Sequence, residues 1–238
     1  MSRYPFGLIL AIALLSGGCA STPGHKAATA KCLKPAPCQA TADGWIELFN
    51  GKDLTGWKLV HRRNVDSWSV QDGIMANIVP PGEAPPDLGT NLVTVEEFGS
   101  CELHIEFKVP EGSNSGAFVN GQYEIQILDS YGQPPSAGAC GSIYAQIAPL
   151  VNVSKPAGEW QSFDIVFHAP TVAPSGKVTK QARMTVYHNG TIIHDHVEVS
   201  EPTGGTYVHE KVRERGPILL QGDHGTVSFR NIRIRPLE

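Results

Sequence analysis

The side chains best suited to chemistry lie in residues 121–129, which read Gly-Gln-Tyr-Glu-Ile-Gln-Ile-Leu-Asp. In an extended strand successive side chains point to opposite faces, so Glu124 and Gln126 share one face and Ile125 and Ile127 share the other. If the isoleucines are buried, the Glu and Gln lie on a solvated, concave face of the sheet. A carboxylate can move a proton and an amide can both donate and accept hydrogen bonds. This strand therefore predicts the floor of a site for a ligand of sugar size.

Further amides occur in three polar segments outside this strand. Asn114 opens an Asn-Ser-Gly tripeptide, Gln146 lies within residues 141–149, and Gln221 begins the pentapeptide Gln-Gly-Asp-His-Gly at 221–225. Amides suit sugar hydroxyls because they cost less to desolvate than charges do. We expect Asn114, Gln126, Gln146 and Gln221 to bind substrate. The alternative for the Asn-Ser-Gly and Gln-Gly-Asp-His-Gly segments is a turn without further function.

Asp129 raises the question of a second carboxylate. The spacing Glu124-x-Gln126-x-x-Asp129 is similar to that of glycosidases that carry their acidic residues on one bulged strand. A bulge would bring Asp129 to the face of Glu124, whereas without one it faces the opposite side. The middle position holds an uncharged Gln, so one carboxylate that works with other groups is favoured over a pair of carboxylates.

Strand-like runs recur along the chain, and convincing amphipathic helices do not. Alternation is clear in residues 102–109, where Leu103, Ile105 and Phe107 share one face. Asn189-Gly190 between two such runs predicts a hairpin, because both residue types tolerate positive φ. With 25 glycines and 18 prolines between short strands, the sequence predicts an all-β, antiparallel two-sheet sandwich. The predicted strands cover 68–75, 100–109, 116–119, 123–128, 161–168, 182–187, 191–197, 217–221 and 226–235.

These segments together make the chain recognisable. It resembles the family of 3-keto-disaccharide hydrolase domains over residues 44–238. The resemblance implies a jelly-roll sandwich of the concanavalin A and laminin G type. The motifs that carry it are Leu-Phe-Asn-Gly-Lys-Asp-Leu-Thr-Gly-Trp at 48–57, Asn-Ser-Gly at 114–116, Tyr-Glu-Ile-Gln-Ile-Leu-Asp at 123–129, Pro-Ala-Gly-Glu-Trp at 156–160, Asn-Gly at 189–190 and Phe-Arg-Asn-Ile-Arg-Ile at 229–234.

The resemblance also implies a chemistry. A ketone at C3 of a sugar acidifies the C2 proton, so the C1 substituent can leave by elimination and water can add afterwards. Such a site needs a base, an acid for the leaving oxygen and a positive group near the enolate. We expect Glu124 to be the base and His224 to be the acid or the enolate stabiliser. Arg230 or a divalent cation is expected to supply the positive charge.

The first residues predict export. A short basic start precedes an apolar run from Phe6 to Leu15, and the small residues Ser16-Gly17-Gly18 precede Cys19. We expect residues 1–19 to be a lipoprotein-type signal with lipidation at Cys19, with ordinary secretion as the alternative. Residues 20–43 lack apolar periodicity and are expected to form a disordered tether. The predicted domain spans 44–238.

The cysteines and the charge set further limits. Cys32 and Cys38 in the tether favour a small disulfide loop, whereas Cys101 and Cys140 either pair or stay as buried thiols. A net charge of −4 without a basic stripe gives no footprint for nucleic acid.

We therefore expect a protein of the bacterial cell envelope whose site binds carbohydrate. A sugar 3-oxidoreductase is expected to supply its keto sugars. The membrane is reached only through the lipid anchor. Two alternatives remain at this point: a carbohydrate-binding module that does no chemistry, and a conventional hydrolase of intact glucans.

Overall fold

The computed structural model describes residues 41–60, 66–79, 90–203 and 210–237. The chain divides into a unit of residues 1–34 and a unit of residues 35–238, and all described residues belong to the second. The predicted signal at 1–19, the lipidation site Cys19, Cys32, Cys38 and nearly all of the tether lie outside the described residues. No helix in the described ranges is long and apolar enough to cross a membrane.

Within these described ranges, eight strands form the larger sheet, in the order β13-β12-β9-β6-β15-β4-β3, with β1 also paired to β15. All of these pairings are antiparallel. The strands are β1 (Ile46–Glu47), β3 (Trp68–Gln71), β4 (Ile74–Asn77), β6 (Cys101–Lys108), β9 (Gln161–His168), β12 (Ala182–His188), β13 (Thr191–Val199) and β15 (Val227–Pro236).

Five strands of the described chain form the smaller sheet, in the order β2-β5-β14-β7-β8, and these are also antiparallel. They are β2 (Trp57–Val60), β5 (Asn91–Thr94), β7 (Asn114–Val119), β8 (Tyr123–Leu128) and β14 (Leu219–Leu220). A separate two-stranded hairpin consists of β10 (Thr171–Val172) and β11 (Val178–Lys180).

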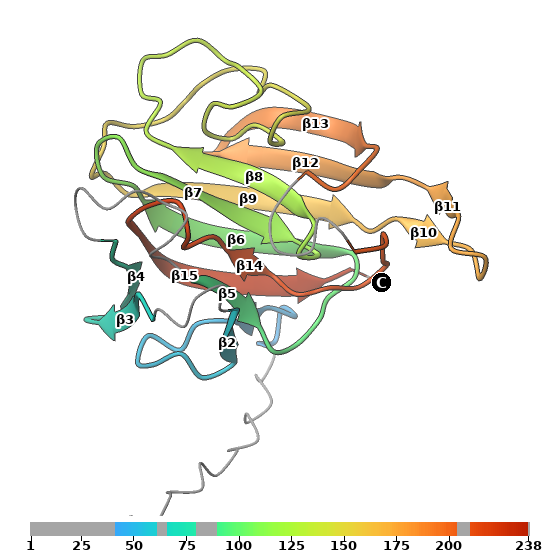
Figure 1. Cartoon of the computed structure of the whole chain (residues 1–238), viewed down its shortest axis with the longest axis horizontal. Helices are drawn as coiled ribbons and strands as arrows, with labels where there is room; N and C mark the ends of the chain where they lie inside the picture. Colours follow the sequence, from blue (N-terminus) through green and yellow to red (C-terminus); the bar gives the residue numbers. More distant parts are fainter. Residues whose placement is uncertain (1–40, 61–65, 80–89, 204–209, 238) are drawn as a thin grey trace, which may run out of the picture. The chain divides into compact units, whose positions relative to one another are not determined.

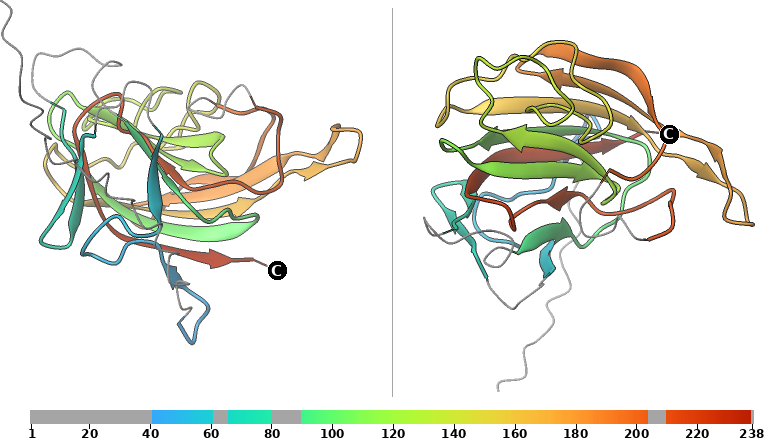
Figure 2. Two further views of the ribbon diagram at one scale, coloured as in Figure 1. Left: turned by 60° about the horizontal axis from the view of Figure 1, so that its bottom comes forward. Right: turned by 45° about the horizontal axis from the view of Figure 1, so that its top comes forward.

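The two sheets pack face to face, with β7 and β8 layered over β6 and β9 (Figures 1 and 2). One hydrophobic core contains Leu103, Ile105 and Phe107 from the larger sheet and Ile125 and Ile127 from the smaller one. The alternation read from residues 102–109 and 123–128 therefore places the expected side chains inside. The predicted all-β antiparallel sandwich is confirmed.

Local turn chemistry explains both a success and a miss. Asn189 and Gly190 have φ of 50° and 77° and join β12 to β13, so the predicted hairpin is confirmed. The single strand predicted at 68–75 is wrong, because Asp72 and Gly73, with φ of 52° and 75°, turn the chain between β3 and β4. Asp-Gly, like Asn-Gly, is a residue pair typical of tight hairpin turns.

A long irregular connection runs from the end of β8 to the start of β9 (Figure 1, yellow-green). Within it, Ile143 forms a bridge to Ile125 in β8. Gln126 N donates to Ser142 O, and Gly141 N donates to Gln126 O. This connection therefore continues the smaller sheet beyond β8 without being a regular strand.

The cysteines of the domain do not pair. Cys101 and Cys140 are both free and buried. Of the two possibilities that the sequence left open, the structure has the buried thiols, whose pKa values burial raises to about 12 and about 11.

Candidate active site

Two neighbouring rows of residues cross the strands on the outward face of the smaller sheet, one apolar and the other containing two glutamines. Val93, Phe118 and Leu219 form a small cluster apart from the main core. Two residues along β7 from Phe118, in the next row on this face, Gly116 pairs with Gln126. Gln221 N donates to Gly116 O over 2.9 Å, which places Gln221 opposite Gly116 on its other side. Because alternate residues share a face, this row and Glu124 lie on one surface.

Gly116 makes the space in which the Glu124 carboxylate lies. Glu124 pairs with Phe118, so its side chain is a diagonal neighbour of Gly116. A Cβ on Gly116 would lie 2.4 Å from Glu124 Oε1 and 3.0 Å from its Cδ. Any side chain at 116 would therefore displace the carboxyl group.

The Gln126 amide holds the same carboxyl oxygen. With the amide nitrogen turned toward its acceptors, Gln126 donates to Ser115 O at 3.0 Å and to Glu124 Oε1 at 3.1 Å. The Asn114 amide oxygen lies 3.3 Å from the Gln126 amide. Three of the residues predicted from the sequence, Glu124, Gln126 and Asn114, therefore meet on one surface.

Glu124 is far more buried than its expected place on a solvated face implies. Glu124 and Gln126 are each only 3% exposed, so this part of the sheet face is not openly solvated. Residues 141–144 pair along the edge of β8, and the Thr203 hydroxyl accepts from Glu124 N. Burial raises the Glu124 pKa from 4.5 to about 8.

Two ionisable neighbours modulate the Glu124 pKa in opposite directions. After burial, the largest influence is His224, which lowers the Glu124 pKa, and the next is Asp223, which raises it. Asp223 is 3% exposed, and its Oδ1 lies 2.7 Å from His224 Nδ1. A buried carboxylate that holds one nitrogen of an imidazole orients the other nitrogen for proton transfer. The two candidates for base and acid are thus brought within electrostatic range.

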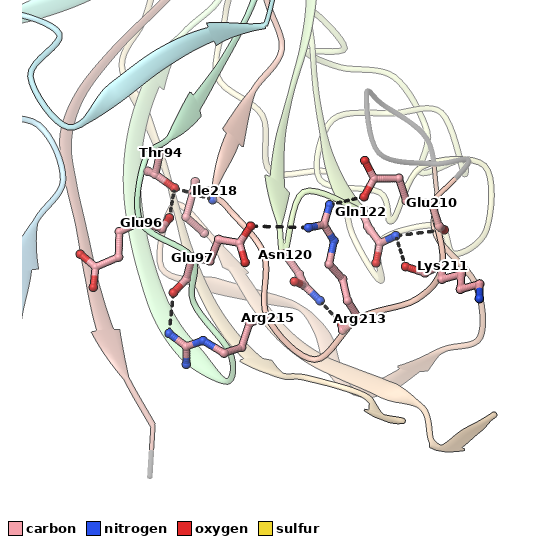
Figure 3. A network of polar contacts seen from close by, with 10 residues as sticks. All are labelled: Thr94, Glu96, Glu97, Asn120, Gln122, Glu210, Lys211, Arg213, Arg215 and Ile218. Atoms are coloured by element: carbon pink, nitrogen blue, oxygen red, sulfur yellow. Dashed lines mark hydrogen bonds and ion pairs between the residues drawn. The ribbon is translucent and has the colours of Figure 1, made fainter. Parts of the chain in front are cut away.

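A polar network fixes residues 210–215, which lead into β14, relative to the β7–β8 hairpin (Figure 3). Asn120 Nδ2 donates to Arg213 O at 2.6 Å, and Gln122 Nε2 donates to Lys211 O at 3.2 Å. Arg213 also pairs with Glu97, 3.5 Å away. The chain that enters β14 is therefore tied to the turn that precedes Glu124.

Arg230 lies elsewhere. It is on β15 of the larger sheet, where its Nε is 2.6 Å from Glu106 Oε2 and its guanidinium stacks 4.1 Å above the Trp160 ring. It borders a pocket of about 440 Å³ on the outward face of that sheet, with His104 and Glu106. Because β8 and β15 belong to different sheets, Arg230 does not fit the expected role of offsetting charge near Glu124.

Asp129 and Gln146 are occupied by the scaffold. The Asp129 carboxylate accepts from Gly112 N at 3.0 Å, and Asp129 is not among the charges that shift the Glu124 pKa. The pairing of β7 with β8 shows no bulge that would bring Asp129 to the face of Glu124. Gln146 is exposed and donates to Glu201 O at 2.9 Å.

Sequence reasoning missed two residues of the site. Asp223 is the carboxylate near Glu124, and its signal was its place directly before His224 in the Gln-Gly-Asp-His-Gly segment. Gly116 was read only as the end of the Asn-Ser-Gly motif and the first residue of a predicted strand. Its role depends on the register between β7 and β8, which the sequence alone does not give.

A divalent cation was one expectation for the positive charge. Across residues 41–60, 66–79, 90–203 and 210–237, no group of three or more His, Cys, Asp or Glu side chains is arranged to hold a metal ion. The donors near Glu124 are Asp223 and His224, which already bind each other. The described side chains therefore do not fit a metal centre, and the chemistry below uses none.

Comparisons with known proteins agree with this fold. A family model described as "3-keto-alpha-glucoside-1,2-lyase-like domain" matches residues 44–235. A curated protein of Bacteroides thetaiotaomicron named 3-keto-disaccharide hydrolase is 31% identical over 159 residues. The match covers 55% of this chain. This chain therefore spans about half of the relative's length, 55%.

Two crystal structures from Parabacteroides distasonis, both assigned as glycosyl hydrolases, are also similar. The first is 36% identical with a TM-score of 0.68, and the match covers 82% of this chain and 84% of that one. The second is 26% identical with a TM-score of 0.57, covering 81% of this chain and 99% of that one. Both support the sandwich fold over nearly the whole described domain.

Proposed function

Because the chain belongs to the family of 3-keto-alpha-glucoside-1,2-lyase-like domains, we propose that it cleaves the glycosidic bond of sugars that carry a ketone at C3. Glu124 is the base in this proposal. The observation that carries it is the buried Glu124 carboxyl, with a pKa of about 8, beside the Asp223–His224 pair. A base whose pKa lies near the working pH combines strength with a useful ionised fraction.

The first step is removal of the C2 proton. The ionised Glu124 takes this proton, and the electron pair spreads onto the ketone oxygen at C3. The pair then forms the C1–C2 double bond as the bond from C1 to the leaving oxygen breaks. Gln126, which donates to Glu124 Oε1, holds the carboxyl group in place during this transfer.

His224 completes the elimination. Its Nδ1 faces Asp223, so the protonated ring presents Nε2–H to the leaving oxygen. Water then adds across the double bond, with its hydroxyl at C1 and a proton at C2. The sum of elimination and hydration is hydrolysis of the keto glycoside, in line with the name of the Bacteroides relative.

A conventional glycosidase would need a second carboxyl group free to act on C1. Asp223 is the carboxylate that affects the Glu124 pKa, and its own carboxylate is hydrogen-bonded to His224. Asp129 is bonded to Gly112 N. The arrangement therefore favours one carboxyl base and one imidazole acid over a carboxylate pair.

The proposal also includes export and a lipid anchor at Cys19, supported by the apolar run before Ser16-Gly17-Gly18-Cys19. The keto substrate must then come from oxidation at C3 by a sugar oxidoreductase. Replacing Cys19 by Ser should abolish incorporation of a fatty-acid label into the protein in cells. Retention of the label would refute the anchor without touching the catalytic proposal.

Cleavage in heavy water tests the reaction. Purified protein is mixed with a glucose disaccharide and with its 3-keto form, with and without a chelator, and followed by NMR. We expect cleavage of the keto sugar alone, unaffected by the chelator, with deuterium at C2 of the product because C2 is deprotonated and reprotonated. Glu124→Gln should lower turnover by about 100-fold or more. The exposed Glu111→Gln is the matched control and should retain it.

Other outcomes would change the assignment. Equal cleavage of both sugars without deuterium at C2 would indicate a conventional hydrolase. Binding of either sugar without cleavage would indicate a carbohydrate-binding module. Loss of activity with the chelator would show that a metal ion takes part.

A further inference from the structure

Gln221 has an amide with no hydrogen-bond partner among the described residues. The residue is 7% exposed, and its Oε1 is buried without a donor. A desolvated acceptor without a partner costs stability, and nearly all buried polar groups in folded proteins are paired. The Gln221 side chain therefore calls for an explanation beyond packing.

The position of Gln221 suggests what the amide meets. It lies opposite Gly116, and Gln126 lies opposite Gly116 on the other side. Neighbouring strands are about 4.8 Å apart, so the backbones of the two glutamines are on the order of 10 Å apart. Gly116 places no side chain between them. The Glu124 carboxyl lies over Gly116, and a single sugar ring set against this carboxyl would have an amide on each side.

The chemistry of the orphan atom narrows the partner. Oε1 is an acceptor only, so its partner must be a donor, and a sugar ring offers hydroxyl donors. Glu124 leans over the same glycine, so a ring held there has its reacting carbon next to the carboxyl group.

We propose that Gln221 Oε1 accepts a hydrogen bond from a ring hydroxyl of the sugar whose C2 proton Glu124 removes. The identity of that sugar rests on the proposed function, whereas the hydroxyl contact does not require the reaction. A site built to bond a hydroxyl rejects an analogue that lacks it, because the buried acceptor is then left unpaired. Gln221 is thus a specificity-determining residue.

The test couples a protein change to a ligand change. Gln221→Met keeps the length of the side chain but removes the acceptor, and Gln221→Glu keeps an acceptor at the same place. Binding of methyl α-glucoside, which has no ketone and is therefore not cleaved in the proposed reaction, and of its monodeoxy analogues is measured by calorimetry for wild type and both variants. The melting temperature of each ligand-free protein is measured in parallel.

The expected pattern is specific. In wild type, loss of one hydroxyl weakens binding by about tenfold or more. In Gln221→Met the parent glycoside binds about tenfold more weakly, and the penalty for that one deoxy position disappears while the others remain. Gln221→Glu keeps the penalty. Ligand-free Gln221→Met melts at the same temperature as wild type or above it, because an unpaired buried acceptor is gone.

Two results would overturn the inference. One is that every deoxy penalty is unchanged in Gln221→Met, and the other is that this variant melts well below wild type, which would mark a structural role. Failure of the hydroxyl contact can be told apart from failure of the proposed reaction. Deuterium at C2 with no coupling at Gln221 refutes only the hydroxyl contact, whereas coupling without cleavage of the keto sugar refutes only the reaction.

Discussion

The Glu124 carboxyl group occupies the place that a side chain at Gly116 would take. A Cβ there would lie 2.4 Å from Glu124 Oε1. The carboxyl group is buried next to Gly116, and the loss of hydration there raises the Glu124 pKa to about 8. The acid–base character of Glu124 therefore depends on a glycine of the neighbouring strand.

Replacing Gly116 by Ala should impair catalysis by moving this carboxyl group. The φ of Gly116 is not in the left-handed region, so alanine adds a clash without backbone strain. We expect turnover of the 3-keto sugar to fall at least about tenfold, and stability to fall by about 1–3 kcal/mol from overpacking. Gly138→Ala is the control, since nothing lies within 4 Å of a Cβ there. Wild-type turnover in Gly116→Ala would show that the position of the carboxyl is not critical.

Glu124 should destabilise the fold as the pH rises. The unfolded chain releases this proton near pH 4.5, whereas the folded protein keeps it until about pH 8. Between these values the folded state binds more protons, so stability is lost as pH rises through this window, by at most about 5 kcal/mol. Glu124→Gln removes the titration and should be the more stable protein at high pH.

Denaturant unfolding of wild type and Glu124→Gln at pH 5 and pH 8.5 measures this effect. The difference in unfolding free energy should be small at pH 5 and should favour the variant at pH 8.5. We expect the variant to be inactive but more stable at pH 8.5, because catalysis requires a buried carboxylate that destabilises the fold. A difference that does not change with pH would mean that the folded Glu124 titrates normally.

Local sequence patterns predicted the parts of the fold that depend on neighbouring residues. Alternation in residues 102–109 placed Leu103 and Phe107 in the core, and Asn189-Gly190 marked its hairpin. The burial of Glu124 was not predictable in this way. The strand that carries Glu124 is bonded along its backbone to residues 141–144 and to Thr203, which reach β8 only through tertiary structure.

The site residues divide along the same line. Glu124 and Gln126 share a strand, so their common face followed from alternation. Arg230 could not be placed, because nothing in its own strand states which of two sheets that strand joins. Asp223 reaches Glu124 through the pairing of β14 with β7, a contact between residues about a hundred positions apart. Pairing partners of this kind are set by the whole topology.

The pH profile of turnover should identify Glu124 as the base. If its ionised form acts, kcat/KM for a 3-keto sugar with a 4-nitrophenyl leaving group, which needs no proton from His224, should rise with pH up to about 8 and then level off. A profile that falls through pH 8 would instead make Glu124 the proton donor. Because His224 lowers the Glu124 pKa, His224→Gln should move the rising limb to higher pH.

His224→Gln should also separate acid catalysis from the rest of the reaction. Turnover of a 3-keto glycoside with an alkyl leaving group should fall by about 100-fold, because the leaving oxygen needs a proton. A 4-nitrophenyl leaving group needs none, so its turnover should fall far less. The exposed His168→Gln serves as control and should leave both rates unchanged. Equal losses for both leaving groups would assign His224 to the enolate instead.

His188 should make the domain sensitive to acid. It is fully buried against Phe107 and Phe163, its Nε2 lies 2.9 Å from Gln161 Oε1, and burial lowers its pKa from 6.5 to about 4. Between these values the unfolded chain takes up a proton that the folded protein refuses, so stability is lost as pH falls from 6.5 to 4. The loss is up to about 3 kcal/mol. Unfolding of wild type and His188→Gln at pH 7 and pH 4 isolates this contribution, because other titrating groups are common to both proteins. The advantage of wild type over the variant should shrink by about that amount at pH 4, and a constant advantage would mean that His188 is protonated in the folded state.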